Sequence, residues 1–353
     1  MVILITGGAG FVGSSLARNI KKRYSNYKII CMDNLKRRGS ELNIPILKAE
    51  GIDFLHGDIR NIEDFDNVGP IDLFLECSAE PSVLAGYDTS PAYLMNTNLV
   101  GTINCLEYAR KNNAIFIFLS TSRVYPMEYI NLLKYKETDS RFELLNEQSI
   151  LGASAEGYSE SFPLDKSRSL YGTTKLASEL IIQEYIQMYG LKAIINRCGV
   201  LTGPGQFGKS DQGVVVLWVA RHFWKQKLSY IGYGGTGKQV RDILHVDDLF
   251  ELIDYQINNL NSLNGETFNV GGGKEISISL KELTALCQKH TGNKIQIDEI
   301  SEDRQADIRI YLTDNSKVTR ITGWKPKISA DKIIEQIYDW ISKNQNQLEG
   351  ILK

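Results

Sequence analysis

Short runs rich in apolar residues, separated by segments long enough to hold helices, are the feature that most constrains this fold. Six such runs cover residues 2–6, 28–33, 52–58, 71–77, 115–120 and 192–198. Runs of this kind are typical of strands that are covered on both faces, as in a parallel sheet flanked by helices. The alternation therefore predicts an α/β fold built on a doubly wound parallel sheet.

Two stretches depart from this alternation. Residues 126–168 are polar and lack clear periodicity, and long insertions of this kind are usually functional loops. After residue 198 the chain turns to Gly-rich segments, such as residues 201–208 and 232–239, with shorter strands and helices. We expect a first, cofactor-binding domain of residues 1–198, with 126–168 as an irregular insertion that lies over the active site, and a smaller, substrate-binding lobe of residues 199–353 interleaved with it.

Composition excludes several classes of protein. The 353 residues are 42% hydrophobic and carry a net charge of −2, which gives no general attraction to nucleic acid or to an anionic membrane. No apolar run approaches the roughly 20 residues that span a bilayer, and the N-terminal stretch is too short and uncharged for a signal peptide. We expect a cytoplasmic protein.

The five cysteines are scattered without zinc-like spacing, so we expect no metal site and no disulfide framework.

A glycine-rich loop follows the first apolar run. Gly7, Gly10 and Gly13 form a GxxGxxG pattern, and Phe11 and Val12 lie where the next helix begins. Glycines at this spacing allow a tight turn and a close approach of the backbone to a pyrophosphate, which the free N–H groups at the helix start can bind. The motif predicts a dinucleotide site in a Rossmann-type domain.

The next two runs end in carboxylates. Asp33 stands where it can accept hydrogen bonds from the adenosine ribose, and it favours NAD because it would repel the 2′-phosphate of NADP. Lys36, Arg37 and Arg38 leave NADP open, since they could neutralise that phosphate. Asp58 either reaches adenine or forms a turn.

Tyr171 and Lys175 lie four residues apart on a predicted helix, so their side chains share one face. A nearby ammonium favours the phenolate form of a tyrosine, and the same lysine can hold the nicotinamide ribose. Thr121, in the hydroxyl cluster that ends the fifth run, can orient a substrate alcohol while Tyr171 removes its proton. These three predicted catalytic residues indicate hydride transfer from an alcohol to NAD.

With these motifs the chain resembles the short-chain dehydrogenase/reductase superfamily, in its extended branch, which modifies nucleotide sugars. The resemblance covers nearly the whole chain and includes GDIR at 57–60, TGPG at 202–205, RDILHVDD at 241–248 and TGWKP at 322–326. It implies an enzyme that uses NAD, and it adds Asn34, Ile59 and Asn98 to the cofactor-binding residues.

Ser122 and Arg123 narrow the reaction that the resemblance implies. Sugar 4,6-dehydratases of this branch carry an Asp-Glu pair directly after the threonine, which supplies acid and base for elimination of water, and its decarboxylases carry a glutamate at the position of Arg123. Of the reactions of this branch, redox chemistry without elimination of water or loss of a carboxyl group remains. We expect Ser122 to contact the substrate; Arg123 either does so as well or pairs with a carboxylate of the insertion, Glu156 or Glu160.

The sharpest resemblance is to the CDP-paratose 2-epimerases, through residues 203–213, 235–249 and the insertion. It implies a CDP-sugar substrate, with C2 of CDP-paratose inverted to give CDP-tyvelose through a 2-keto intermediate. The alternatives are a 4-epimerase or a reductase acting on another nucleotide sugar. A non-catalytic NAD-binding sensor is a third possibility, which the three catalytic residues argue against.

The resemblance also implies substrate contacts in the C-terminal lobe. Arg241 and Arg309 match arginines that contact the nucleotide diphosphate, for which a bidentate guanidinium is the natural partner. Four residues are candidates for contacts to the sugar or the base, namely Gln206, Asp211, Gln212 and Gln239. The alternative is that they form hydrogen bonds within their own loops. We expect Asp242 and His245 to be structural.

One stretch and one further position depart from the pattern of the branch. Residues 75–80 are Leu-Glu-Cys-Ser-Ala-Glu, where the branch usually has Phe-His-Leu-Ala-Ala-Gln, and Val200 replaces a substrate-binding asparagine. Glu80 is the unusual carboxylate that we expect near the nicotinamide or the sugar. Both departures bear on the identity of the sugar rather than on the cofactor.

The family further implies a homodimer or a larger homo-oligomer. The candidate interface helices are residues 98–112 and the helix that begins near Tyr171.

Overall fold

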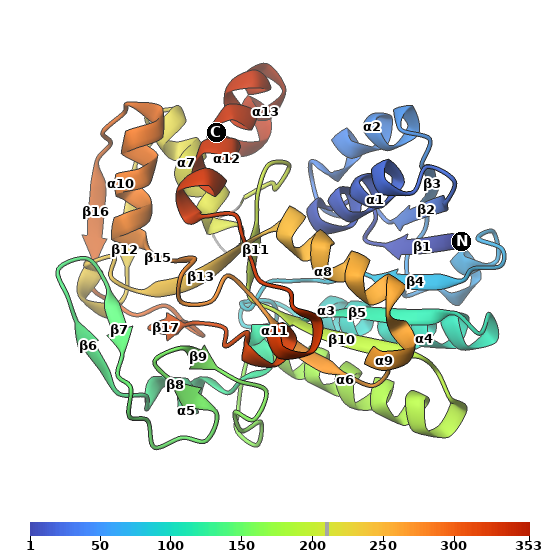
Figure 1. Ribbon diagram of the computed structural model, residues 1–353. Coiled ribbons are helices and arrows are strands. Elements are labelled where there is room, and N and C mark those ends of the chain that lie inside the picture. The colour runs from blue at the N-terminus through green and yellow to red at the C-terminus, as the bar shows by residue number, and fades with distance from the viewer. Residues whose placement is uncertain (209–211) are drawn as a thin grey trace. The chain divides into compact units, whose positions relative to one another are not determined.

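The computed structural model describes residues 1–208 and 212–353, which form two compact units (Figure 1). The first unit comprises Met1–Val124, Ser169–Cys198 and Leu249–Phe268. The second comprises Tyr125–Arg168, Gly199–Asp248 and Asn269–Lys353. The functional division expected at residue 198, with a cofactor domain and a nucleotide-sugar lobe, stays a prediction.

A seven-stranded sheet organises the first unit. Its strand order is β14-β10-β5-β4-β1-β2-β3, and the pairs from β10 to β3 are all parallel. The strands are β1 (Val2–Thr6), β2 (Lys28–Asp33), β3 (Asp53–His56), β4 (Leu73–Glu76), β5 (Ile115–Thr121), β10 (Ala193–Cys198) and β14 (Thr267–Val270), of which the first two residues belong to this unit. The order reverses between β1 and β4, which is the arrangement of a doubly wound sheet. The predicted fold class is confirmed.

Helices cover this sheet on both faces, with α1 on one side and α4 and α6 on the other (Figure 1). The helices of the unit are α1 (Phe11–Arg23), α2 (Asn43–Ala49), α3 (Ala92–Met95), α4 (Gly101–Lys111), α6 (Leu170–Tyr189), α8 (Val246–Asn258, from Leu249 onward) and α9 (Leu260–Leu263). A π-helical turn, η3 (Asn96–Val100), leads into α4, and short 3₁₀ turns cover Ser40–Leu42 (η1), Ile62–Phe65 (η2) and Ser122–Val124 (η4).

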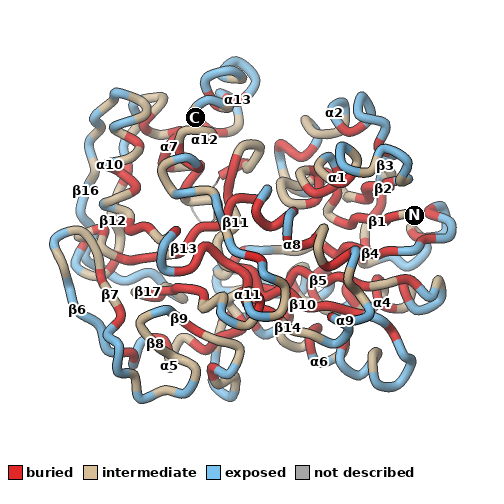
Figure 2. The backbone as a smooth tube through the Cα atoms, in the orientation of Figure 1, coloured by how far each residue is buried: buried red, intermediate tan, exposed pale blue. Residues whose placement is uncertain are grey.

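The core explains why these strands appear as apolar runs. Phe74 on β4 and Phe116 and Phe118 on β5 are fully buried and pack with Leu106 of α4 and Ile182 of α6. The central strands are buried along almost their whole length (Figure 2). A strand that is covered on both faces tolerates few polar residues, so those that it does contain have a specific structural or chemical reason.

The second unit is built on a small mixed sheet. Strand β13 (Val240–His245) pairs in parallel with β11 (Val200–Thr202) and β17 (Ile310–Tyr311), and antiparallel with β15 (Ser277–Ser279). A two-stranded sheet joins β12 (Leu228–Ile231) to β16 (Ile297–Ile300), and a 3₁₀ turn, η5, spans Tyr233–Gly235. The helices are α7 (Val214–Phe223), α10 (Leu280–Thr291), α11 (Ser316–Thr322), α12 (Ala330–Lys343) and α13 (Gln345–Leu352).

The insertion of residues 126–168 is more ordered than its sequence indicates. It holds a short helix, α5 (Met127–Asn131), and two hairpins, β6 (Tyr135–Glu137) with β7 (Phe142–Leu144) and β8 (Ala153–Ser154) with β9 (Gly157–Tyr158). The expectation of an irregular loop was wrong. Strands of two or three residues are too short to show the alternation by which a strand is recognised.

No helix within residues 1–208 and 212–353 combines the length and the apolar character that crossing a membrane requires.

Candidate active site

The loop after β1 forms a cradle of backbone N–H groups at the start of α1. Gly10 is the N-cap of this helix in an extended conformation, and its N–H donates to the carbonyl of Gly7 at 3.0 Å. No side chain of the described residues caps the helix, and its first turn, which is fully described, contains no acidic residue. The first N–H groups of a helix have no partner within it, so those around Phe11 and Val12 can bind an anion.

Packing explains why glycines form this cradle. Gly7 has φ +64°, and a Cβ there would lie 2.8 Å from the carbonyl oxygen of Cys77. A Cβ at Gly13 would lie 2.3 Å from the carbonyl oxygen of Gly7. Both contacts are with backbone atoms that cannot move without displacing the loop. Side chains at these two positions would therefore displace the loop, and its binding of a dinucleotide pyrophosphate stays a prediction.

Asp33, at the end of β2, connects the cradle to the sheet. Its Oδ2 accepts a hydrogen bond from the N–H of Ala9 at 3.1 Å, and its Oδ1 accepts one from the N–H of Leu35 at 2.8 Å. Burial raises the pKa of Asp33, and these backbone donors oppose the rise. The nearby Lys36 lies over the ring of Tyr93, at 4.5 Å from its centroid.

A second polar group lies beside the cradle at the end of β3. Asn34 donates to Asp58 at 2.8 Å, and Arg60 pairs with the same carboxylate at 2.6 Å. Burial works to raise the pKa of Asp58, but hydrogen bonds from Arg60 and Asn34 lower it to about 2. Ile59 is buried and packs where a Cβ of Gly101 would otherwise lie. The structure thus brings three of the predicted cofactor residues together.

The three predicted catalytic residues all belong to the first unit, and all are largely buried. Thr121 is the last residue of β5, and its Oγ1 accepts a hydrogen bond from the N–H of Arg123 at 3.2 Å. Tyr171 and Lys175 lie in the first two turns of α6, which the Ser169 side chain caps by accepting from the N–H of Gly172. The turn Ser122–Val124 packs against α6.

Asn98, a predicted cofactor residue, is fully buried in the π-helical turn η3. Its side chain exchanges hydrogen bonds with the backbone of Glu80 at 2.8 and 3.0 Å, and it donates to Thr174 on α6 at 3.4 Å. Its backbone carbonyl accepts from Ser178 at 3.0 Å. Asn98 therefore fixes the segment after β4 against the helix that carries Tyr171.

Two buried ion pairs beside these residues were not predicted from the sequence. Glu179 on α6 pairs with Arg197 on β10 at 2.7 Å and accepts from Ser120 at 2.5 Å. Glu76, at the end of β4, lies 3.5 Å from the ammonium of Lys175. The unusual residues at 75–80 could have indicated the second pair, because they include Glu76. From this stretch, however, Glu80 was the residue predicted to lie near the nicotinamide or the sugar.

In the second unit, both predicted phosphate-binding arginines have partners within the chain. Arg241 pairs with Asp307 at 2.7 Å and donates to the carbonyl of Ile308 at 2.5 Å. The guanidinium of Arg309 lies over the rings of Tyr135 and Tyr233, at 4.3 and 4.9 Å from their centroids. An aromatic face stabilises a cation without using its N–H donors, and these donors can still bind phosphate oxygens.

The predicted sugar and base contacts of the second unit lie near β11, β12 and α7. Gln206 donates to the carbonyl of Leu201 at 3.0 Å, and Gln239 donates to that of Ile231 at 3.1 Å. Gln212 lies just before α7, and Asp211 lies outside the described residues. The roles of these glutamines as substrate contacts stay predictions.

Asp242 and the insertion carboxylates have structural partners. Asp242 is fully buried and accepts from the N–H groups of Gly273 and Thr313 at 3.0 and 3.2 Å. Glu156 pairs with Lys274 at 2.8 Å, and Glu160 accepts from the N–H of Asn269 at 2.7 Å. The contact of Arg123, with the substrate or with a carboxylate of the insertion, stays a prediction.

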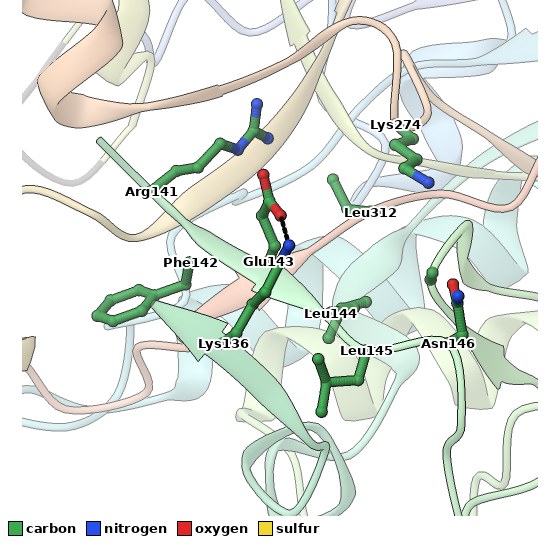
Figure 3. A pocket seen from close by; sticks show the side chains of 10 residues that line it. Lys136, Arg141, Phe142, Glu143, Leu144, Leu145, Asn146, Lys274 and Leu312 are labelled. Atoms are coloured by element: carbon green, nitrogen blue, oxygen red, sulfur yellow. Dashed lines mark ion pairs between the residues drawn. The ribbon is translucent and has the colours of Figure 1, made fainter. Parts of the chain in front are cut away.

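A pocket of about 300 Å³ in the second unit involves none of the predicted site residues (Figure 3). Three of its lining residues are basic, but each has a carboxylate partner. Lys136 pairs with Glu143 at 2.9 Å, Arg141 with Glu282 at 3.6 Å, and Lys274 with Glu156. Each of the three basic residues that line the pocket is thus paired with a carboxylate of the described chain.

A glycine cradle at a helix start on a doubly wound sheet defines a dinucleotide-binding class of domain, in which the buried threonine, tyrosine and lysine are the candidate catalytic residues. Residues 3–271 match the NAD dependent epimerase/dehydratase family. The chain belongs to this family. Its members depend on NAD, which confirms the predicted cofactor, and the chain is an enzyme of the nucleotide-sugar epimerase/dehydratase superfamily.

Three proteins are similar to this chain over nearly its full length and theirs. The chain is 32% identical to the CDP-paratose 2-epimerase of Salmonella typhi, over 97% of this chain and 99% of the relative. It is 28% identical to a dTDP-glucose 4,6-dehydratase of Escherichia coli, over 99% and 95% of the two chains. It superimposes on the Thermus thermophilus UDP-glucose 4-epimerase in complex with NAD with a TM-score of 0.77, at 25% identity, covering 97% and 99% of the two chains.

Proposed function

We propose that this enzyme inverts C2 of CDP-paratose to give CDP-tyvelose, with NAD as the bound redox cofactor. The observation that carries the proposal is the 32% identity to a CDP-paratose 2-epimerase over 97% of the chain. A dTDP-glucose 4,6-dehydratase matches at 28%, but Ser122 and Arg123 stand where dehydratases of this branch carry their Asp-Glu pair. The elimination that a dehydratase performs would lack its acid and base here.

The proposed reaction begins with oxidation of the C2 alcohol. Thr121 binds the C2 hydroxyl, and Tyr171 as phenolate takes its proton while the C2 hydrogen leaves with its electron pair. Lys175 stabilises the phenolate by its charge. NAD, held by the Gly7–Gly13 loop and Asp33, would supply the acceptor and the donor for that hydrogen.

The second half of the reaction reverses these steps on the other face of the sugar. The 2-keto sugar reorients, C2 regains its hydrogen, and Tyr171 returns the proton to the oxygen. One residue therefore serves as both base and acid. The cycle leaves no net oxidation, so no external oxidant or reductant is needed.

Arg241 and Arg309 are the proposed diphosphate ligands. Arg241 is already engaged by Asp307, so a phosphate must replace this carboxylate or share the guanidinium with it. The aromatic rings around Arg309 restrict its orientation before a ligand binds, which lowers the entropy cost of binding.

A homodimer through α4 and α6 is also proposed. These helices contact each other, and Tyr185 of α6 donates to Glu107 of α4 at 2.7 Å. Large apolar side chains remain exposed on α6, with Leu180, Met188 and Tyr189 at 55%, 66% and 52%. Light scattering should give a dimer mass for the wild type and a monomer mass for Leu180→Arg. Leu151→Arg, at another exposed leucine, should remain dimeric; a monomeric wild type would contradict the proposal.

Proton NMR of the product tests the proposed activity. Purified enzyme with NAD should convert CDP-paratose to CDP-tyvelose, and Tyr171→Phe should bind NAD normally while turnover falls by at least about 10²-fold, the scale of general acid–base catalysis. Absence of CDP-tyvelose with NAD bound would refute the proposal. Formation of a C4 epimer from another nucleotide sugar would favour the 4-epimerase alternative.

A further inference from the structure

The ammonium of Lys175 lies between a carboxylate and an aromatic ring. Its Nζ is 3.5 Å from Glu76 Oε2 and 4.3 Å from the centroid of Phe118. The Lys175 side chain is 2% exposed and that of Glu76 is not exposed at all. Neither oxygen of Glu76 has a hydrogen-bond partner of standard geometry among the residues that the structure describes. A carboxylate with so few other contacts acts mainly through its charge on Lys175.

Among the described residues, three thiols interact electrostatically with this pair. They are Cys77, Cys105 and Cys198, from the segment after β4, from α4 and from β10. Burial raises the pKa of each of these thiols far above the neutral range. Thiolates therefore do not balance the charge of Lys175.

The protonation of Glu76 depends on Lys175. Burial raises the pKa of Glu76, and the ammonium of Lys175 and the N–H of Ser78 oppose that rise. An isolated carboxylate in this position would take up a proton, because a buried charge without a partner is costly.

We propose that Glu76 is a positioning residue that holds the Lys175 ammonium at the end of β4 and offsets its charge, and thereby sets the basicity of Tyr171. The inference rests on the proposed roles of Tyr171 and Lys175. The Glu76 carboxylate opposes the phenolate that Lys175 favours. Because the proposed cycle requires Tyr171 both to take a proton and to return it, a base of intermediate strength serves both halves.

Glu76→Gln removes this charge with little change in shape. The phenolate of Tyr171 should then form at lower pH, by at least about one pH unit, which is tenfold more phenolate at a fixed pH. Ultraviolet difference spectra of NAD-free protein, taken against Tyr171→Phe in each background, measure the phenolate directly. The pH profile of turnover should move in the same direction.

Two further variants separate charge from structure. Glu76→Asp retains the charge and should restore the wild-type profile at least in part. Glu179→Gln removes an equally buried carboxylate from α6 and should leave the pH at which the phenolate forms unchanged. If Glu76→Gln does not fold, Glu76→His, the residue that the branch usually has there, replaces it, because histidine is uncharged in the alkaline range.

The spectra of these variants test the proposed role of Glu76. A phenolate that forms at the wild-type pH in Glu76→Gln, or in Glu76→His, overturns it, as does a Glu179→Gln variant with the same shift as Glu76→Gln. The spectra need neither CDP-paratose nor turnover, so failure of the proposed substrate leaves this test intact. A wild-type protein that epimerises CDP-paratose but shows no spectral shift in the variant rejects only the role of Glu76.

Discussion

Replacing Gly13 by alanine should abolish most NAD binding while the protein still folds. The new Cβ would lie 2.3 Å from the carbonyl oxygen of Gly7 and 2.9 Å from the Cα of Gly8. Overpacking of this kind costs about 1–3 kcal/mol, and alanine in a helix returns up to about 1 kcal/mol relative to glycine. The net loss is small beside the roughly 5–15 kcal/mol that stabilises a folded domain.

The loop absorbs this clash because both contacts are with its own backbone. A displaced loop no longer presents its N–H groups to the pyrophosphate, so calorimetry should show at least a tenfold weaker affinity for NAD, about 1.4 kcal/mol. Gly190→Ala is the matched control, since Gly190 ends α6 with φ +66° and has open space around it. It should lower the melting temperature and leave NAD affinity unchanged. Wild-type affinity in Gly13→Ala would refute the reasoning.

Two further predictions concern buried charges. Glu179→Gln leaves Arg197 buried without its carboxylate and should lower the free energy of unfolding by about 3–5 kcal/mol in urea titrations; a loss below about 1 kcal/mol would contradict this. Burial raises the pKa of Asp242 to about 6 from 3.8, so the folded state binds a proton more tightly than the unfolded state, and stability is lost as pH rises from about 4 to about 6. The loss should reach about 3 kcal/mol and be absent in Asp242→Asn; parallel pH dependences of the two proteins would refute it.

The strands of the first unit could be predicted because burial on both faces is visible in the sequence. The predicted runs 2–6 and 28–33 coincide with β1 and β2, and the run 115–120 falls one residue short of the end of β5. A covered parallel strand needs consecutive apolar residues, and the glycine motif marks where the first strand passes into a helix. The short strands of the insertion carry no comparable pattern.

The contacts of the charged residues could not be predicted from the sequence. Glu76 and Lys175 meet because the fold brings the end of β4 close to the start of α6, and Arg241 and Asp307 of the second unit are likewise brought together by the fold. The residues adjacent to each of these four in the sequence do not indicate its ion-pair partner. Only the tertiary structure determines which opposite charge it faces. The motif predicted Lys175, but only the structure identified its carboxylate partner.

In the proposed reaction Tyr171 removes and returns the proton of the C2 hydroxyl, and bound NAD would serve as acceptor and donor of the C2 hydrogen, which returns to the opposite face. CDP-paratose labelled with deuterium at C2, incubated with the purified enzyme and NAD in ordinary water, tests this directly by NMR. The CDP-tyvelose formed should retain deuterium at C2. CDP-tyvelose with hydrogen from solvent at C2, or no CDP-tyvelose from an enzyme with NAD bound, would contradict it.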